Sequence, residues 1–189
     1  MSEGSGMSEV SERYRRIANE FTARVEAVSD GAWDNPAPCE GWVARDVVRH
    51  LVEWLPAFFS GTWDFDVPPG PSVDDDPVAA WSRLNTAIQS ALDDPAIAAD
   101  ERDTRMGSKS FADTIDMICT PDVLVHTWDL ARATGLDETL DADEVHRMLV
   151  AMEPLDEILR SSGHYGPRVI VPDDADEQTK MIAFTGRTP

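Results

Sequence analysis

Apolar residues recur at intervals of three and four along most of the chain, and this spacing is that of one face of an α-helix. The first such run ends before Gly31 and comprises Val10, Tyr14, Ile17, Phe21, Val25 and Val28. A second run, from about Val43 to Phe59, comprises Val43, Val47, His50, Trp54 and Phe58. Because each run makes an amphipathic helix, the chain is expected to bury these faces against one another as a mainly helical protein.

The start of a third helix is marked by helix-capping residues. Asp76 can accept a hydrogen bond from the first turn, and Pro77 suits the first helical position because its missing N–H costs nothing there. The apolar face comprises Trp81, Leu84, Ile88 and Leu92, and Asp93-Asp94-Pro95 ends the helix. The preceding segment, 64–76, is rich in proline and aspartate and is predicted to be a surface loop.

The most apolar helical segment, from Phe111 to Ala133, contains a proline at position 121. A proline in a helix interior costs about 3 kcal/mol, whereas one in the first turn costs little. Two outcomes stay open: a kink at Pro121, or a new helix that starts near Thr120 with this threonine as its cap. Gly135 is predicted to end the segment.

The remaining third of the chain predicts one more helix and an irregular tail. Asp141 and Glu144 are spaced as a capping box, and Pro154 is expected to bend the helix that follows. Its apolar face comprises Val145, Met148, Leu149, Met152, Leu155, Ile158 and Leu159. Beyond Gly163, a short β-like run covers 168–171, and 176–184 is read as either a strand or a short helix. The whole predicts a bundle of four or five helices.

The acidic charge balance excludes several classes of partner. Lysine and arginine together number 16, and aspartate and glutamate 36, which gives a formal net charge of −20. Such a field repels nucleic acids and anionic lipids, because binding to them requires cations that neutralise phosphates. We therefore expect neither a nucleic acid nor a membrane as a partner.

Cysteine usage and the first residues indicate a cytoplasmic protein. Cys39 and Cys119 lie far apart without a C-x-x-C motif, a pattern typical of a reducing compartment. The first residues are small and polar, and no apolar run approaches the length of about 18 residues that suggests a membrane span. We expect residues 1–7 to be a disordered tail or a cloning remnant, and residues 8–189 to form a single helical domain.

Asp122 and His126 stand four residues apart, so they project from the same face of a helix. With His50 from the second helix they would form a facial metal site that keeps a position open for water or substrate. No lysine or arginine lies within a turn of Asp122 to compensate its charge, and a metal ion would do so. The alternatives are a hydrogen-bonded core histidine at position 50, a salt bridge from a distant arginine to Asp122, or its exposure at the proline.

Two further aspartates are spaced to orient the imidazoles. Asp46 lies four residues before His50, and Asp129 lies one turn beyond His126, so either could accept a hydrogen bond from a ligand histidine. For both, and above all for Asp46, the alternative is a helix-terminal or surface salt bridge with Arg45, Arg49 or Arg132. Cys39 is read either as a reactive thiol at a helix N-terminus or as a buried, inert one.

Several motifs carry a resemblance to a known family. They are Cys39-Glu40-Gly41-Trp42 with Asp46 and His50, then 126–135 (His-Thr-Trp-Asp-Leu-Ala-Arg-Ala-Thr-Gly), and Thr185-Gly186-Arg187-Thr188-Pro189. The chain resembles the actinobacterial metal-binding proteins related to the N-terminal domain of mycothiol-dependent maleylpyruvate isomerase, within the DinB-like superfamily. The resemblance implies a DinB-like up-and-down four-helix bundle with an extra C-terminal helix, and a divalent ion held by His50, Asp122 and His126. The isomerase usually has glutamate where this chain has Asp122.

The resemblance also implies a class of chemistry. Members of the superfamily are similar to transferases in which a metal ion activates a low-molecular-weight thiol for attack on an electrophile. The expected partners are therefore a small-molecule thiol, with mycothiol as cosubstrate, and an electrophilic substrate. Zinc is the ion expected first, with nickel or another divalent ion as alternatives. A non-catalytic metal- or ligand-binding module stays open, and so does a homodimer.

Overall fold

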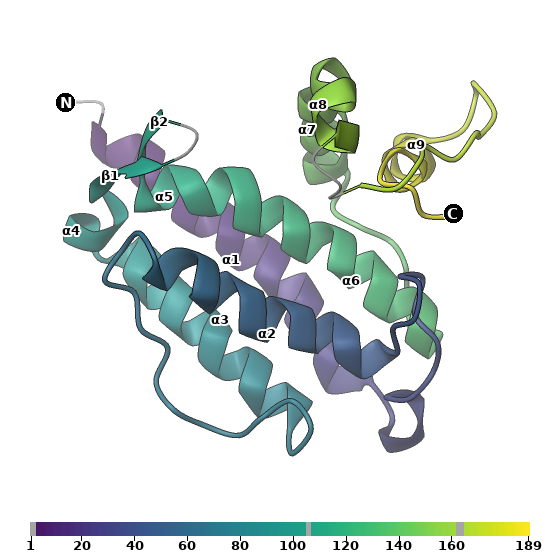
Figure 1. Ribbon diagram of the computed structural model, residues 1–189, viewed down its shortest axis with the longest axis horizontal. Helices are drawn as coiled ribbons and strands as arrows, with labels where there is room; N and C mark the ends of the chain where they lie inside the picture. Colours follow the sequence, from purple (N-terminus) through teal and green to yellow (C-terminus); the bar gives the residue numbers. More distant parts are fainter. Residues whose placement is uncertain (1–2, 105–106, 162–164) are drawn as a thin grey trace.

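The fold is a bundle of four long helices. The structure is a computed structural model that describes residues 3–104, 107–161 and 165–189, with the backbone alone described for residues 3–8. The bundle helices are α1 (Glu3–Ala27), α2 (Ala44–Ser60), α3 (Pro77–Asp93) and α6 (Thr120–Thr134). Helix α1 packs against α3 and α6, and α2 packs against the same two, so α1 and α2 lie on a diagonal (Figure 1). The predicted helical bundle is thereby confirmed.

The directions of the four helices follow from contacts between their ends. Ser11, in the first half of α1, donates to Asp93 at the end of α3. Trp81, near the start of α3, donates to Thr22 in the second half of α1, so these two helices run antiparallel. Arg49 in α2 pairs with Asp74, just before α3 begins, so α2 and α3 run parallel. Figure 1 shows the connection 61–76 returning along the bundle to make this possible. A simple alternation of direction, expected for the bundle, therefore fails between α2 and α3.

The length of the connection 61–76 explains this difference. A helix of 17 residues such as α2 is about 25 Å long at 1.5 Å per residue. Sixteen extended residues reach about 50 Å, enough to return to the end at which α2 began. The prolines in this segment keep it extended.

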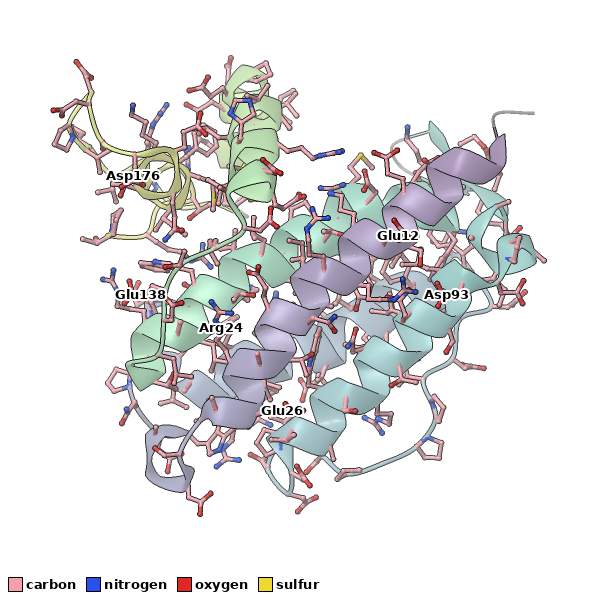
Figure 2. All side chains as sticks on the ribbon, turned by 180° about the vertical axis from the view of Figure 1, so that it is seen from behind. Glu12, Arg24, Glu26, Asp93, Glu138 and Asp176 are labelled. Atoms are coloured by element: carbon pink, nitrogen blue, oxygen red, sulfur yellow. The ribbon has the colours of Figure 1, made fainter. Side chains whose placement is uncertain are left out.

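The first helix begins earlier than the sequence predicts. Residues 1–7 were expected to lie outside the fold, but the backbone is helical from Glu3 onward, and residues 1–2 lie outside the described part. A helix that is already nucleated adds one hydrogen bond for each residue it gains, so it can extend through the weak helix formers Gly4, Ser5 and Gly6. Figure 2 shows α1 from behind, lying between α3 and α6.

The proline at position 121 is accommodated by a π-helical turn. Helix α5 (Phe111–Thr114) continues through a π turn (Ile115–Cys119) directly into α6. The N–H of Thr120 bonds to the carbonyl of Ile115, five residues back, and the Thr120 hydroxyl donates to the same oxygen at 3.2 Å. Thr120 is therefore not a cap that starts a separate helix. A widened turn absorbs the proline instead, and such turns occur often at functional sites.

The ends of α3 and α6 match the sequence prediction. The Asp76 carboxylate accepts a hydrogen bond from the Ala79 N–H at 2.9 Å, and Pro77 is the first residue of α3. Gly135 follows α6 with a φ of 70°, a left-handed conformation that favours glycine. The predicted apolar face of α3 is buried.

A short hairpin and two single turns lie outside the predicted elements. Strands β1 (Glu101–Thr104) and β2 (Gly107–Ser110) pair antiparallel, with Glu101 opposite Ser110. The other short elements are a 3-10 turn, Asp30–Ala32, and α4 (Pro95–Ala98). The hairpin strands were missed because their residues are polar throughout and show no apolar alternation.

The last third of the chain forms three shorter helices beside the bundle: α7 (Ala142–Met152), α8 (Asp156–Ser161) and α9 (Glu177–Phe184). Asp141 caps α7 through the Glu144 N–H at 2.9 Å, as predicted. The expected break occurs at Pro154, inside a 3-10 turn, Glu153–Leu155. Beyond this turn the helical register changes, so Leu155 and Ile158, predicted to face the core, are exposed.

The tail was predicted only in part. Segment 176–184, read as a strand or a helix, is α9, which packs against α7. Residues 168–171 are irregular, so the β-like run predicted there is wrong; no described strand lies alongside to pair with it. Within residues 3–104, 107–161 and 165–189, no helix combines the length and the apolar character required to cross a bilayer.

Candidate metal centre

His50 from α2 converges with Asp122 and His126 from α6. His50 Nε2 lies 3.4 Å from Asp122 Oδ2, and His126 Nε2 lies 3.5 Å from Asp122 Oδ1. One potential ligand atom from each residue lies within 4.8 Å of the other two. Two imidazole nitrogens and a carboxylate at this separation can hold a single divalent ion.

The two helices present their ligands at different depths. The buried face of α2 is made by Val47, Val48, Leu51, Leu55 and Phe59. His50 lies beside this face with 29% of its side chain exposed, whereas the His126 side chain is 5% exposed. The site therefore has a closed side, at His126, and a side toward solvent, at His50.

The carboxylate of Asp122 is held in its charged form by two imidazoles and an indole rather than by a lysine or arginine. Burial opposes its ionisation, but the nearby imidazoles of His126 and His50 and a hydrogen bond from Trp54 outweigh burial and lower the pKa of Asp122. Trp54 Nε1 donates to Oδ2 at 3.0 Å. Among the described residues, no lysine or arginine forms an ion pair with Asp122, so the salt bridge considered as an alternative does not form.

His126 is oriented by Asp129, at the position where the sequence predicts an orienting carboxylate. His126 Nδ1 lies 2.8 Å from Asp129 Oδ2, and Asp129 is fully buried. Burial raises the pKa of Asp129, but hydrogen bonds from His126 and Arg187 outweigh this and lower it to about 2. An ionised carboxylate only accepts hydrogen bonds, so Nδ1 carries a proton, and Nε2, which faces Asp122 and His50, is the ring nitrogen left to bind an ion.

Arg187 and Trp42, to which the sequence assigns no individual role, complete the surroundings of these groups. Arg187 donates to Asp129 through two nitrogens, from Nε to Oδ1 and from Nη2 to Oδ2, each at 2.7 Å. Trp42 stacks on the His126 ring at 5.9 Å between centroids and lies 5.2 Å from the His50 ring. The motifs that contain Arg187 and Trp42 were the only sequence signal for either.

Asp46, the other aspartate predicted to orient a histidine, is placed elsewhere. Its carboxylate accepts hydrogen bonds from the Val43 N–H at 3.0 Å and from Arg49 Nε at 3.2 Å. It therefore caps the start of α2 and pairs with a surface arginine, which is the alternative that the sequence left open. The first-turn position explains this, because free backbone N–H groups there attract a carboxylate.

A second cluster of potential ligands comprises Cys39, His126 and Asp129. A cation already lies among them, because the Arg187 guanidinium donates to Asp129 and to Cys39 Sγ, the latter at 3.4 Å. The Nδ1 atom of His126 is also engaged by Asp129. The group formed by His50, Asp122 and His126 is therefore the better candidate for a metal ion.

Cys39 is expected to react slowly with alkylating agents. Burial and the charge of Asp129 raise the pKa of its thiol to about 11, although Arg187 opposes this. At neutral pH, a thiol with a pKa of about 11 has about a 100-fold smaller thiolate fraction than a thiol with a pKa of about 9. Iodoacetamide labelling followed by peptide mass spectrometry should find Cys39 about 100-fold slower than free cysteine, with a rate still rising tenfold per pH unit up to pH 9.5. A plateau below pH 9 would contradict this assignment.

A helical bundle with two histidines and a carboxylate facing one another across α2 and α6 defines a class of candidate metal-binding proteins. The chain belongs to the family of the mycothiol maleylpyruvate isomerase N-terminal domain, whose model matches residues 14–131, more than half of the chain. The matched region contains the three candidate ligands and Asp129, while Arg187 lies beyond it.

The chain is also similar to two mycobacterial proteins. They are the uncharacterized proteins Rv0738 and MT0763 of Mycobacterium tuberculosis, from strains H37Rv and CDC 1551. Each is 26% identical over 177 residues, which cover 93% of this chain and 96% of the relative. No solved structure has significant similarity to the chain.

Proposed function

We propose that this protein binds one divalent metal ion through His50, Asp122 and His126, and uses it to transfer a low-molecular-weight thiol to an electrophilic substrate. The observation that carries the proposal is the charged Asp122 carboxylate between two imidazoles, one of which is held by Asp129 with its Nε2 atom toward Asp122. Among the described residues, no lysine or arginine forms an ion pair with Asp122, and a divalent ion would supply that positive charge.

The donor set fits a catalytic zinc ion and does not exclude nickel. Two imidazoles and a carboxylate are common ligands for both ions. Three protein donors are one fewer than zinc takes in a closed structural site, which leaves a position for a small molecule. The partly exposed His50 side gives such a molecule a route to the site.

The chain's own residues define what chemistry the site supports. A bound divalent ion lowers the pKa of a thiol ligand and so favours the thiolate at neutral pH. Cys39 has a raised pKa and Cys119 is fully buried, so neither is suited to act as the nucleophile. An external thiol would therefore be required, and the family to which the chain belongs points to mycothiol. Trp42 and Trp54 flank His50 and would limit water beside the reacting thiol.

The proposal is tested by loading the protein with a metal ion and then assaying thiol transfer. Metal-free protein, prepared with a chelator, is titrated with zinc and with nickel, and the binding stoichiometry is measured by calorimetry. The loaded and metal-free forms are then incubated with mycothiol and an electrophile such as 1-chloro-2,4-dinitrobenzene. We expect one ion per chain and a rate that requires both ion and protein. Cysteine in place of mycothiol controls for unspecific thiol activation.

Three results separate the alternatives. A metal-dependent rate with mycothiol supports the transferase. Stoichiometric binding with a rate equal to the metal-free control leaves a non-catalytic metal-binding module. No binding of any divalent ion removes the metal centre itself and with it the proposed reaction.

A further inference from the structure

We infer that Arg187, in the C-terminal segment of the chain, is a positioning residue of the metal centre, because it fixes the carboxylate that orients His126. The inference rests on the proposed metal binding and extends it to a residue outside the region matched by the family model. It implies that the C-terminal segment contributes to ion binding through Arg187, which does not itself supply a ligand atom.

The geometry of the pair supports a positioning role. Arg187 Nε and Nη2 donate to the two different oxygens of Asp129, each at 2.7 Å, which is the bidentate arrangement that a planar guanidinium favours. Asp129 Oδ2 also accepts from His126 Nδ1. One carboxylate therefore joins both groups, and its plane cannot turn without lengthening a hydrogen bond to Arg187. The orientation of the His126 ring is coupled to Arg187 in this way.

The residues directly before Arg187 are packed against neighbouring segments, which fixes its position. Phe184 and Thr185 are buried, and Arg160 donates to the carbonyl oxygens of Phe184 and Gly166. Gly186 has a φ of 91°, and a Cβ atom there would lie 2.9 Å from the Gly166 Cα. Only glycine fits this close approach in a left-handed conformation. The segment before Arg187 is thus anchored against its neighbours rather than extended into solvent.

A surface salt bridge would not have these properties. Arg187 is largely buried beside a fully buried aspartate, and it also contacts Cys39 Sγ. Loss of a group that orients a metal-binding histidine typically weakens metal binding 10- to 100-fold. Arg132 offers a matched comparison, because it makes an equally bidentate pair with Glu138 rather than with Asp129, and both side chains of that pair are at least a third exposed.

The test compares Arg187→Gln, Arg187→Lys and the control Arg132→Gln with the unmodified chain. Zinc affinity is measured by calorimetry, and the d–d absorption of the Co²⁺-loaded forms reports the ligand environment. We expect about 10- to 100-fold weaker zinc binding and an altered Co²⁺ spectrum for Arg187→Gln. Arg187→Lys should lie between this variant and the unmodified chain, because lysine keeps the charge but not the paired geometry. Arg132→Gln should match the unmodified chain in both measurements.

The outcomes distinguish this inference from the proposed function. If the unmodified chain binds no ion, the metal centre itself is wrong. If the unmodified chain binds zinc and Arg187→Gln binds it within twofold with the same Co²⁺ spectrum, the positioning role is overturned while the metal centre stands. Should circular dichroism show Arg187→Gln unfolded, Arg187→Lys decides: unchanged affinity and spectrum overturn the inference, and weaker binding with a shifted spectrum supports it.

Discussion

His126→Ala is expected to abolish stoichiometric binding of a divalent ion, with an affinity at least about 10³-fold below that of the unmodified chain, since one of only three protein ligands is lost. The side chain is 5% exposed and is held by Asp129 on its far side, so it is the most rigid of the three candidate ligands. Calorimetric titration of metal-free protein with zinc measures the effect.

His146→Ala is the matched control for this variant. His146 also pairs with an acidic side chain, Glu177, at 2.9 Å, but it lies on the exposed surface of α7. We expect this variant to bind zinc as the unmodified chain does. The assignment of His126 as a ligand would be wrong if both variants kept one ion per chain with equal affinity.

Arg13→Met is expected to lower the free energy of unfolding by about 3–5 kcal/mol, because it leaves the buried Glu144 carboxylate without its cation. Arg13 lies on α1 and donates to both Glu144 oxygens, at 2.7 Å from Nε to Oε2, and to Asp116 in the π turn. Both Arg13 and Glu144 are buried. For a chain of this size the change corresponds to a fall in Tm of roughly 6–20 °C.

Two further variants make the stability test specific. Arg15→Met removes an exposed pair with Asp93 from the same helix and should cost no more than about 1 kcal/mol. Combining Arg13→Met with Glu144→Gln should recover part of the loss, because the buried charge is then removed as well. Equal urea midpoints for Arg13→Met and Arg15→Met would show that the buried network contributes little.

The helices could be predicted from the sequence because each carries its own signal. The faces of α1 and α3 repeat every three or four residues, and the start of α3 has both a capping aspartate and a proline at the first position. The direction of α3 carries no such local signal. It depends on where the 61–76 loop leads, as Figure 1 shows, and the contacts that fix it join residues far apart in the chain, such as Arg49 and Asp74.

Contacts between distant segments also secure the segment after α6. Arg24 near the end of α1 donates to the carbonyl oxygens of Thr139 and Asp137, at 2.8 and 3.3 Å. Figure 2 shows Arg24 on the side of α1 that faces this segment, which leads to α7. No pattern within α1 distinguishes Arg24 from a solvent-exposed arginine. Such pairings are set by the fold, and a single sequence does not contain them.

In the candidate site, too, some contacts follow from spacing along one helix, and others depend on how distant segments pack. Asp122 and His126 share a helix face, so their proximity follows from spacing alone. Asp46 and Asp129 each lie about one turn from a histidine, yet only Asp129 contacts one. The Asp46 carboxylate instead accepts a hydrogen bond from the Val43 N–H and caps the start of its own helix. Arg187 is 58 residues from Asp129, and its role depends on how the tail packs.

The most direct test of the metal centre is anomalous X-ray diffraction from crystals of the protein grown with zinc, with data collected on both sides of the zinc absorption edge. We predict one anomalous peak per chain, bordered by His50 Nε2, the Asp122 carboxylate and His126 Nε2. A peak located instead among Cys39, His126 and Asp129, or zinc bound only at surface carboxylates, would contradict the proposed metal centre.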